Sequence, residues 1–284
     1  TDGGSTWQSL GAPSASTALL LKSTDRVRFN PDGFKGGTPT LSLRGWDQTS
    51  GTATSGATRG EADVSTNGGI TAFSSSEYTL SVNVTNVNDA PQFTTGASTG
   101  AFTENAGAVN VGSGLVITDD GGQLSRATVS ISSGFTAGDT LAVGTAGGLT
   151  VSYSSQTGVL TLTGTASAAT YQTALNSVTF NTASEDPTLN SATRTLTWKA
   201  TDTAGVSSAD STSTVNVTPL ADAPVLGGQP ATWNYTEDDG ARVIAPSLTL
   251  SDVDDTQLAG ATVAITGTGY LTDGRETLAA ITTG

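Results

Sequence analysis

Apolar and polar residues alternate with a period of two in several short stretches of the chain, and Gly, Asn or Asp residues separate these stretches. Such alternation is typical of strands that turn one face towards a core, and the separating residues are typical of turns. The pattern predicts six strands in the middle of the chain, at 127–133, 149–155, 158–164, 177–181, 194–200 and 211–218. Apolar residues of 166–178 recur near helical spacing, which predicts one short helix there. Six or seven strands in about 130 residues indicate an all-β, antiparallel β-sandwich of immunoglobulin-like type.

Two phrases of the chain repeat at a distance of 133 residues. "SVNVTNVNDAP" at 81–91 and "TVNVTPLADAP" at 214–224 are identical at seven of 11 positions. Beyond these segments the same spacing aligns "FTENAG" at 102–107 with "YTEDDG" at 235–240, so that Glu104 corresponds to Glu237. After one insertion, Asp119 in "LVITDDGGQLSRATVSI" corresponds to Asp252 in "LTLSDVDDTQLAGATVAI". A fixed period of this size predicts tandem domains.

The beginning of the chain matches the same unit from its other end. "RVRFNPDG…TLSLRGWDQTSG" at 26–51 resembles "SVTFNTASEDP…TLTWKATDTAG" at 177–205, and Asp47 falls opposite Asp202. The preceding residues 3–29 resemble a strand pair whose "ALLL" run faces the core. These matches predict three parts, namely the C-terminal half of a domain at 1–91, a complete domain at 92–223 and the N-terminal half of a further repeat at 224–284.

Composition narrows the chemistry that the chain can perform. The chain has 284 residues, of which 35% are apolar, enough to give two or three domains a core. No segment approaches the roughly 18 apolar residues that a membrane span needs, so a soluble chain is expected. There is no Cys and no His, which excludes thiol chemistry, imidazole catalysis and Cys/His metal sites. There is also no Met and no visible signal peptide, so we interpret the chain as a processed product or an internal window.

Acidic residues outnumber basic ones by 25 to 11, for a net charge of −14. Nucleic acid is not an expected partner, because neutralising phosphates requires a basic surface. Catalysis is not expected either, since no Gly-x-Ser-x-Gly motif precedes a helix and no His is present to activate a hydroxyl. The acidic surface could serve solubility alone, so the positions of the acids decide its meaning.

The acids gather at the ends of the repeated units rather than along their strands. Those near the first junction are Asp89, Asp119, Asp120 and Asp202, and those near the second are Glu104, Asp222, Asp252, Asp254 and Asp255. Hard oxygen ligands on turns are what Ca²⁺ selects, at six to eight per ion. A single Asp or Asn pair would be explained by a turn in which the side chain bonds its own backbone. Recurrence at matching positions favours calcium over that simpler explanation.

These motifs resemble the cadherin-type repeats of very large secreted, calcium-binding bacterial adhesins. The linker "NVNDAP" is similar to the family's D-x-N-D-N-A-P linker, with Asn86, Asn88 and Asp89 in matching places. The family's early glutamate matches Glu104 and Glu237.

The remaining motifs of the resemblance lie after the linkers. The family's D-x-D matches Asp252 and Asp254, and its A-x-D matches Asp202 in "KATDTAG". Asp119 and Asp120 are adjacent where the family has D-x-D.

The resemblance implies an elongated rod of domains in which calcium stiffens each joint. It assigns Asn86, Asn88, Asp89, Asp119, Asp120 and Asp202 to the first junction, and Glu104, Asp222, Asp252, Asp254 and Asp255 to the second. The second linker has Pro219 and Ala221 in place of the two asparagines, which predicts a weaker site there. The implied partners are neighbouring repeats, other copies of the chain, and a surface glycan or protein. The implied location is extracellular, secreted or on a bacterial cell surface.

Two alternatives to this stalk remain open from the sequence. The tryptophans Trp7, Trp46, Trp198 and Trp233 could form an aromatic platform for a sugar or peptide, although an alternating strand around Trp198 favours the core. Separate subunits could also complete each other's half-domains, with open strand edges driving head-to-tail assembly.

Overall fold

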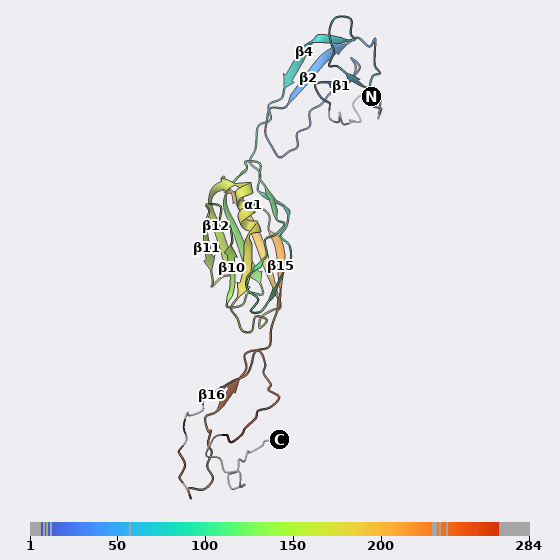
Figure 1. Ribbon diagram of the computed structural model, residues 1–284. Helices are drawn as coiled ribbons and strands as arrows, with labels where there is room; N and C mark the ends of the chain where they lie inside the picture. The colour runs from blue at the N-terminus through green and yellow to red at the C-terminus, as the bar shows by residue number, and fades with distance from the viewer. Residues whose placement is uncertain are drawn as a thin grey trace.

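The computed structural model describes residues 7, 9, 11, 13–56, 58–228, 232, 234–236 and 238–266. Three parts follow one another, with β1–β4 at one end and β16–β17 at the other (Figure 1). Between them lies the part with the continuous core, called here the central sandwich, residues 92–218. Two residues of the sequence comparison, Trp233 and Glu237, fall outside the described residues.

The central sandwich contains eleven strands and one helix. Its strands are β5 Gln92–Thr95, β6 Gly100–Thr103, β7 Val109–Asn110, β8 Val116–Thr118, β9 Gln123–Ser133, β10 Asp139–Val143, β11 Thr150–Ser154, β12 Val159–Ser167, β13 Val178–Thr182, β14 Thr193–Asp202 and β15 Ser211–Thr218. The helix is α1, Ala168–Asn176. All six predicted strands and the predicted helix are confirmed. The expected total of six or seven strands was wrong. Strands β5–β8 have two to four residues each, too few for alternation to be read, and the five-residue β10 was missed although its burial alternates.

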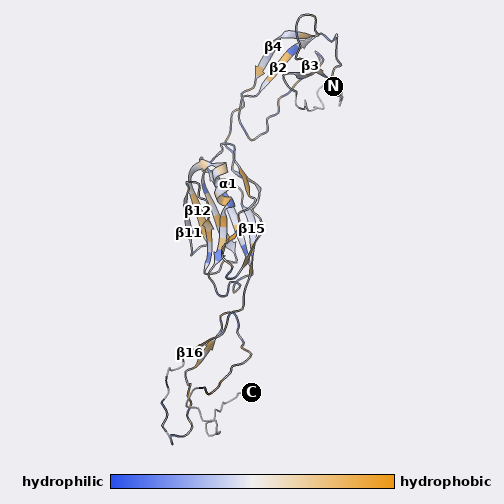
Figure 2. Cartoon of the chain, viewed as in Figure 1, coloured by the Kyte–Doolittle hydropathy of each residue, from blue (hydrophilic) through white to orange (hydrophobic). Residues whose placement is uncertain are grey.

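The sandwich has two layers. One is a six-stranded sheet in the order β11-β12-β9-β14-β15-β6, and the other holds β10-β13-β7 with the separate pair β5-β8. Neighbours are antiparallel except β15 and β6, which run parallel. Strand β9 lies between β12 and β14, and Trp198 of β14 stands opposite Val129 of β9. Apolar and polar residues alternate along these strands (Figure 2).

The core between the layers is built from inward-facing residues of both sheets. Trp198, Phe102 and Phe180 are at most 1% exposed, and the two phenylalanine rings meet edge to face at 5.4 Å. The Trp198 Nε1–H donates a 2.9 Å hydrogen bond to Ser213 Oγ, which satisfies its one buried donor. The expectation that Trp198 belongs to the core is therefore confirmed.

Helix α1 replaces a strand beside β8. Ser167 caps the helix, because its Oγ accepts from the Thr170 backbone N–H at 3.1 Å. Gln172 Oε1 accepts from the Ile117 N–H at 3.1 Å, and the Asn176 side chain bonds both backbone groups of Leu115. Side-chain amides thus stand in for a neighbouring strand and fix the segment that leads into Asp119.

The terminal parts are smaller. The first contains β1 Thr17–Leu19, β2 Thr40–Trp46, β3 Glu61–Asp63 and β4 Phe73–Ser81, and the last contains β16 Val225–Gly227 and β17 Thr249–Ser251. β2 pairs with β4 and β1 pairs with β3, around the small buried cluster Leu20, Val64, Ala72 and Phe73. The expected strand pair within 3–29 was wrong for the residues that are described, since β1 finds its partner at 61–63. The "ALLL" run does contribute Leu20 to that cluster.

Candidate metal sites at the two junctions

The first linker lies against the loops at one end of the central sandwich. Asn86 Nδ2 donates to Asp120 Oδ2 at 2.6 Å, while its Oδ1 accepts from the Gly36 backbone N–H at 2.8 Å. Asn88 Nδ2 donates to Asp202 Oδ2 at 2.8 Å. The two amides therefore bring the N-terminal part, the linker and two loops of the sandwich to one place, although the residues in contact are up to 114 positions apart.

Two adjacent carboxylates follow β8 at this junction. Asp119 is 6% exposed, and its Oδ1 lacks a hydrogen-bond partner, as does Oδ1 of Asp120. Burial, followed by the negative charges of Asp120 and Asp202, raises the pKa of Asp119. The hydrogen bond from Asn86 is the main cause that lowers the pKa of Asp120, with a smaller one from the Asp89 backbone. Asp89 itself is half-buried.

Asp202 ends β14 and is 1% exposed. Its Oδ1 accepts from the Val206 N–H at 2.8 Å, and its backbone carbonyl accepts from Ser125 Oγ at 2.5 Å. The side chain is thus held by its own turn and the backbone by the start of β9, while Oδ2 accepts from Asn88 of the linker.

The second junction begins with a buried glutamate. Glu104 is 2% exposed, and its Oε2 accepts from the Leu220 N–H of the second linker at 2.8 Å. Its other oxygen, Oε1, has no hydrogen-bond partner. Carboxylate oxygens of Glu104, Glu185 and Asp222 all lie within 4.8 Å of one another. Carboxylates this close repel one another, and a cation bound between them would offset that repulsion.

Three aspartates after β17 form a second group with the same spacing limit, namely Asp252, Asp254 and Asp255. Asp252 Oδ1 accepts from the backbone N–H groups of the other two, at 3.3 and 3.2 Å. Asp254 Oδ2 accepts from the Asp222 N–H at 3.2 Å, which connects this group to the linker. A hydrogen bond between the side chains of Asp252 and Asp254 lowers the pKa of the former and raises that of the latter.

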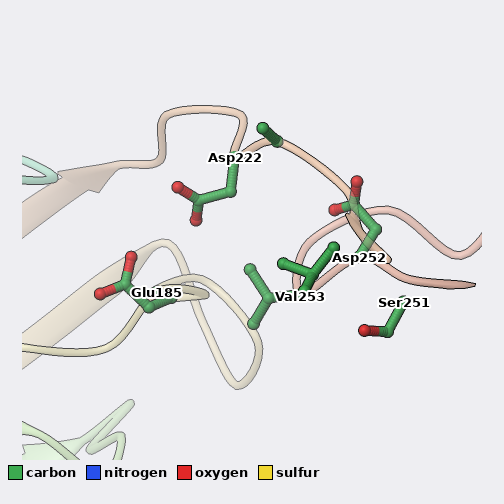
Figure 3. A pocket seen from close by; sticks show the side chains of 7 residues that line it. Glu185, Asp222, Ser251, Asp252 and Val253 are labelled. Carbon is green, nitrogen blue, oxygen red and sulfur yellow. The ribbon is translucent and has the colours of Figure 1, made fainter. Parts of the chain in front are cut away.

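The two groups face an open cleft of about 510 Å³ (Figure 3). Glu185 and Asp222 line one part of it, and Ser251, Asp252 and Val253 line another. The cleft therefore opens between the end of the central sandwich and the C-terminal part, where the linker joins them.

Five buried side-chain oxygens lack a hydrogen-bond partner among the residues that the structure describes. They are Glu104 Oε1, Asp119 Oδ1, Asp120 Oδ1, Asp222 Oδ2 and Asp254 Oδ1. All five belong to residues that the sequence nominated as ligands. Buried polar atoms are normally paired, so orphaned carboxylate oxygens at both junctions mark places for a cation. An all-oxygen donor set on flexible turns fits Ca²⁺.

Comparisons with known proteins identify no family for this chain. No protein-family model matches it, and no curated protein matches. Among solved structures it is similar to Drosophila N-cadherin EC1-4, with 18% identity over 65% of this chain and a TM-score of 0.29. It is also similar to the titin domains Z1Z2 in complex with telethonin, with 9% identity, 75% of this chain, all of that chain and a TM-score of 0.25. The chain spans 38% of the length of the cadherin structure. The chain is an all-β sandwich protein, as predicted.

One residue at the second junction was missed by the sequence reasoning. Glu185 lies in the loop before β14, in "SEDP", and has no counterpart among the motifs that the resemblance carries over. The sequence did offer one indication of Glu185, because it is an acidic residue in a predicted turn of the central unit. Only the strand order shows that this turn lies at the same end as Glu104.

The described tryptophans do not form a common platform. Trp198 is fully buried, and Trp46 is half-buried and donates to the Ser50 carbonyl at 2.8 Å. The Trp7 ring is covered by the Arg28 guanidinium, whose Cζ lies 4.4 Å from the ring centroid. No helix in the described residues is long and apolar enough to cross a membrane.

Proposed function

We propose that this chain is a structural segment of tandem cadherin-like repeats, in which Ca²⁺ at each junction holds successive β-domains in a fixed orientation. Its three parts would be the C-terminal half of one domain at 1–91, a complete domain at 92–223 and the N-terminal half of the next at 224–284. Such a segment would serve a secreted or cell-surface bacterial adhesin, holding its binding modules away from the cell. The role is structural rather than catalytic.

The observation that carries this proposal is the position of the unpartnered carboxylate oxygens. Asp119 and Asp120 stand at the first junction, while Glu104, Asp222 and Asp254 stand at the second. At the second junction the group spans the linker, with Glu104 in the sandwich, Asp222 in the linker and Asp254 in the C-terminal part, so an ion bound there would contact both parts. At the first junction both aspartates belong to the sandwich, and Asn86 of the linker contacts Asp120. At the first junction, Asn86, Asn88, Asp89 and Asp202 complete the proposed donor set, and at the second, Glu185, Asp252 and Asp255.

Bound calcium would supply positive charge that offsets the mutual repulsion of these carboxylates. The chain's own residues provide the preorganisation, because hydrogen bonds to Leu220, Val206 and Asp254 already fix the loops. An ion that binds only the aligned arrangement stabilises it by about 2.7 kcal/mol at one hundred times its dissociation constant. Without the ion, short polar linkers are expected to allow the parts to reorient.

The test is a calcium titration of chelated protein, with thermal stability and small-angle X-ray scattering followed together. Calcium should raise the midpoint of unfolding and increase the maximum dimension of the particle. Asp119→Ala/Asp120→Ala and Asp252→Ala/Asp254→Ala should each reduce that response at one junction. If calcium changes neither stability nor dimension, the acids are turn residues on an acidic surface and the proposal is wrong.

A second prediction concerns Glu185. The variant Glu185→Gln should weaken calcium binding at the second junction by roughly tenfold or more, because even indirect supports of a metal site commonly contribute that much. Isothermal titration calorimetry measures this loss. The matched control is Asp186→Asn, which removes one negative charge from the same loop but lies outside the carboxylate group. Equal weakening by both variants would indicate a general charge effect and remove Glu185 from the site.

A further inference from the structure

The first linker makes direct contacts with the parts on both of its sides. Asn86 is central to them, because its Oδ1 accepts from the Gly36 backbone N–H at 2.8 Å while its Nδ2 donates to Asp120 Oδ2 at 2.6 Å. One neutral side chain therefore joins the N-terminal part to the central sandwich. Asn88 adds a second bond to the sandwich, from its Nδ2 to Asp202 Oδ2 at 2.8 Å.

The backbone supports this contact on the side of the N-terminal part. Gly37 and Val84 exchange two backbone hydrogen bonds, of 3.0 and 2.9 Å. Beside them Gly36 packs directly on the linker, since a Cβ at that glycine would lie 2.7 Å from the Asn86 backbone nitrogen. A Cβ at Gly37 would meet no heavy atom within 4 Å beyond its chain neighbours. Of these two adjacent glycines, only Gly36 is therefore required by close packing.

The contacts to the N-terminal part join peptide and amide groups, and the junction carboxylates take no part in them. On the side of the sandwich, the two amides donate to carboxylates, and such charge-assisted hydrogen bonds are stronger than those between neutral groups. They satisfy Oδ2 of Asp120 and of Asp202 and leave Oδ1 of Asp120 unpaired. The first junction thus has hydrogen bonds of its own that fix its orientation.

The second linker lacks these side chains. At the positions 133 residues after the two asparagines it carries Pro219 and Ala221, neither of which has a side-chain donor. Among the described residues, the hydrogen bond from this linker to the C-terminal part runs from the Asp222 N–H to Asp254 Oδ2 at 3.2 Å. Its acceptor belongs to the group of three aspartates after β17, which repel one another. The connection to the C-terminal part therefore depends on a carboxylate in a crowded acidic group.

We propose that the first junction is a calcium-independent joint, held by the side chains of Asn86 and Asn88, and that calcium controls orientation at the second junction. The first half of this inference stands without an ion, and the second half rests on the proposed function. At the first junction a bound ion would add stability without changing the orientation. The reorientation expected without calcium is therefore confined to the second linker, so that the protein has one hinge rather than two.

Distances between spin labels test this difference directly. The chain has no cysteine, so Thr79→Cys/Ser152→Cys labels the first junction and Ser152→Cys/Thr249→Cys labels the second, at three exposed positions. In chelator, double electron–electron resonance should give a narrow distance distribution across the first junction and a broad one across the second. Calcium should narrow the second distribution and leave the first unchanged. A first distribution as broad as the second in chelator overturns the proposal.

Substitutions in the labelled protein identify the groups that hold the first junction. In chelator, Asn86→Ala/Asn88→Ala should broaden the first distribution, and Gly36→Ala should broaden it too, because the added Cβ displaces the loop from the linker. One matched control is Gly37→Ala, and the other is Asn83→Ala, at an exposed asparagine whose side chain makes no hydrogen bond among the described residues. Both controls should keep the narrow distribution. A width that Asn86→Ala/Asn88→Ala leaves unchanged overturns the proposal.

The variant Asn86→Asp separates the amide bridge from the ion. Its carboxylate keeps an acceptor for the Gly36 N–H but cannot donate to Asp120 and repels it, so the first distribution should be broad in chelator. Calcium should narrow it again, because the added carboxylate is a ligand of the kind that this ion prefers. A narrow distribution for Asn86→Asp in chelator overturns the proposal. The widths in chelator decide the first joint by themselves, whereas a second distribution that calcium leaves unchanged contradicts the proposed function.

Discussion

At the scale of single residues, the junctions contain buried carboxylates that lack a hydrogen bond to one of their oxygens. Asp119 is 6% exposed and Glu104 is 2% exposed, yet each has an oxygen without a partner. Folding that buries such groups costs free energy unless a cation binds. These residues therefore lower the stability of the ion-free protein, and the proposed ion would offset that loss.

The variant Asp119→Asn separates those two effects. Burial and neighbouring acids raise the pKa of Asp119 above its ordinary 3.8. At a pH above that raised pKa, the ionised side chain lowers the free energy of unfolding. Acidification through the raised pKa protonates the side chain and restores this free energy. We expect Asp119→Asn to raise the unfolding midpoint in chelator at neutral pH, by roughly 4 °C per 1 kcal/mol gained. The variant should also flatten the rise in stability on acidification.

In saturating calcium the order should reverse, because the amide is a poorer ligand for the ion. Differential scanning calorimetry with and without chelator checks both signs. The control is Asp210→Asn, whose side chain is 54% exposed and pairs with Lys199 away from the junctions. A lower midpoint for Asp119→Asn in chelator would show that the ionised carboxylate stabilises the fold by itself.

At the scale of elements, a buried ion pair organises the loop that carries Glu185. Arg194 and Asp139 are fully buried and joined at 2.7 Å. The Arg194 guanidinium also donates to the carbonyls of Pro187 at 2.6 Å and Ser191 at 2.5 Å. One side chain thus ties β14, β10 and the junction loop together, so the fold of the sandwich sets the position of a proposed ligand.

Removing one partner of this pair should be far more damaging than removing both. Arg194→Met should lower the free energy of unfolding by about 3–5 kcal/mol, because it leaves Asp139 buried and unpaired. Arg194→Met/Asp139→Leu should recover most of that loss, since both buried charges are gone. Urea unfolding measures these differences.

The double variant should nevertheless bind calcium less tightly at the second junction, because the Pro187 and Ser191 carbonyls lose their shared donor. Calorimetric titration of the folded double variant tests this. Unchanged affinity there would show that the loop holds Glu185 in place without Arg194.

At the scale of the whole molecule, stability is concentrated in the middle. The central sandwich holds a core of more than twenty buried apolar residues, whereas the N-terminal part has a cluster of four and the described C-terminal residues 224–228 and 238–266 contribute none to either cluster. The junctions therefore connect one body with a large buried core to two parts that bury few apolar residues among those described.

Limited proteolysis should reveal this difference directly. Digestion of the protein with chymotrypsin in chelator should yield a resistant fragment that begins near Pro91 and ends near Pro224, as read by mass spectrometry. Local opening is easiest where few apolar contacts are buried. Calcium should slow cuts close to both linkers. Early cleavage within the central sandwich, before either terminal part is lost, would contradict this distribution of stability.

The sequence by itself determined the all-β class, six of the strands with helix α1, and the clustering of acids near the ends of the repeated units. These features depend on residues that are close together in the sequence, namely on alternation of period two and on short motifs that recur after 133 residues. Strands β5–β8 were not predictable, because two to four residues cannot display a period. Strand β10 has five residues, as many as the predicted β11 and β13, so its length does not explain why it was missed.

Only the tertiary structure decided which side chains meet. The contact of Asn88 with Asp202 spans 114 positions, and the group of Glu104, Glu185 and Asp222 joins three segments of the chain. Such meetings depend on the order of strands in the sheets, which sets the end of the sandwich to which each loop belongs. Strand order arises from packing of the whole core and not from any one motif.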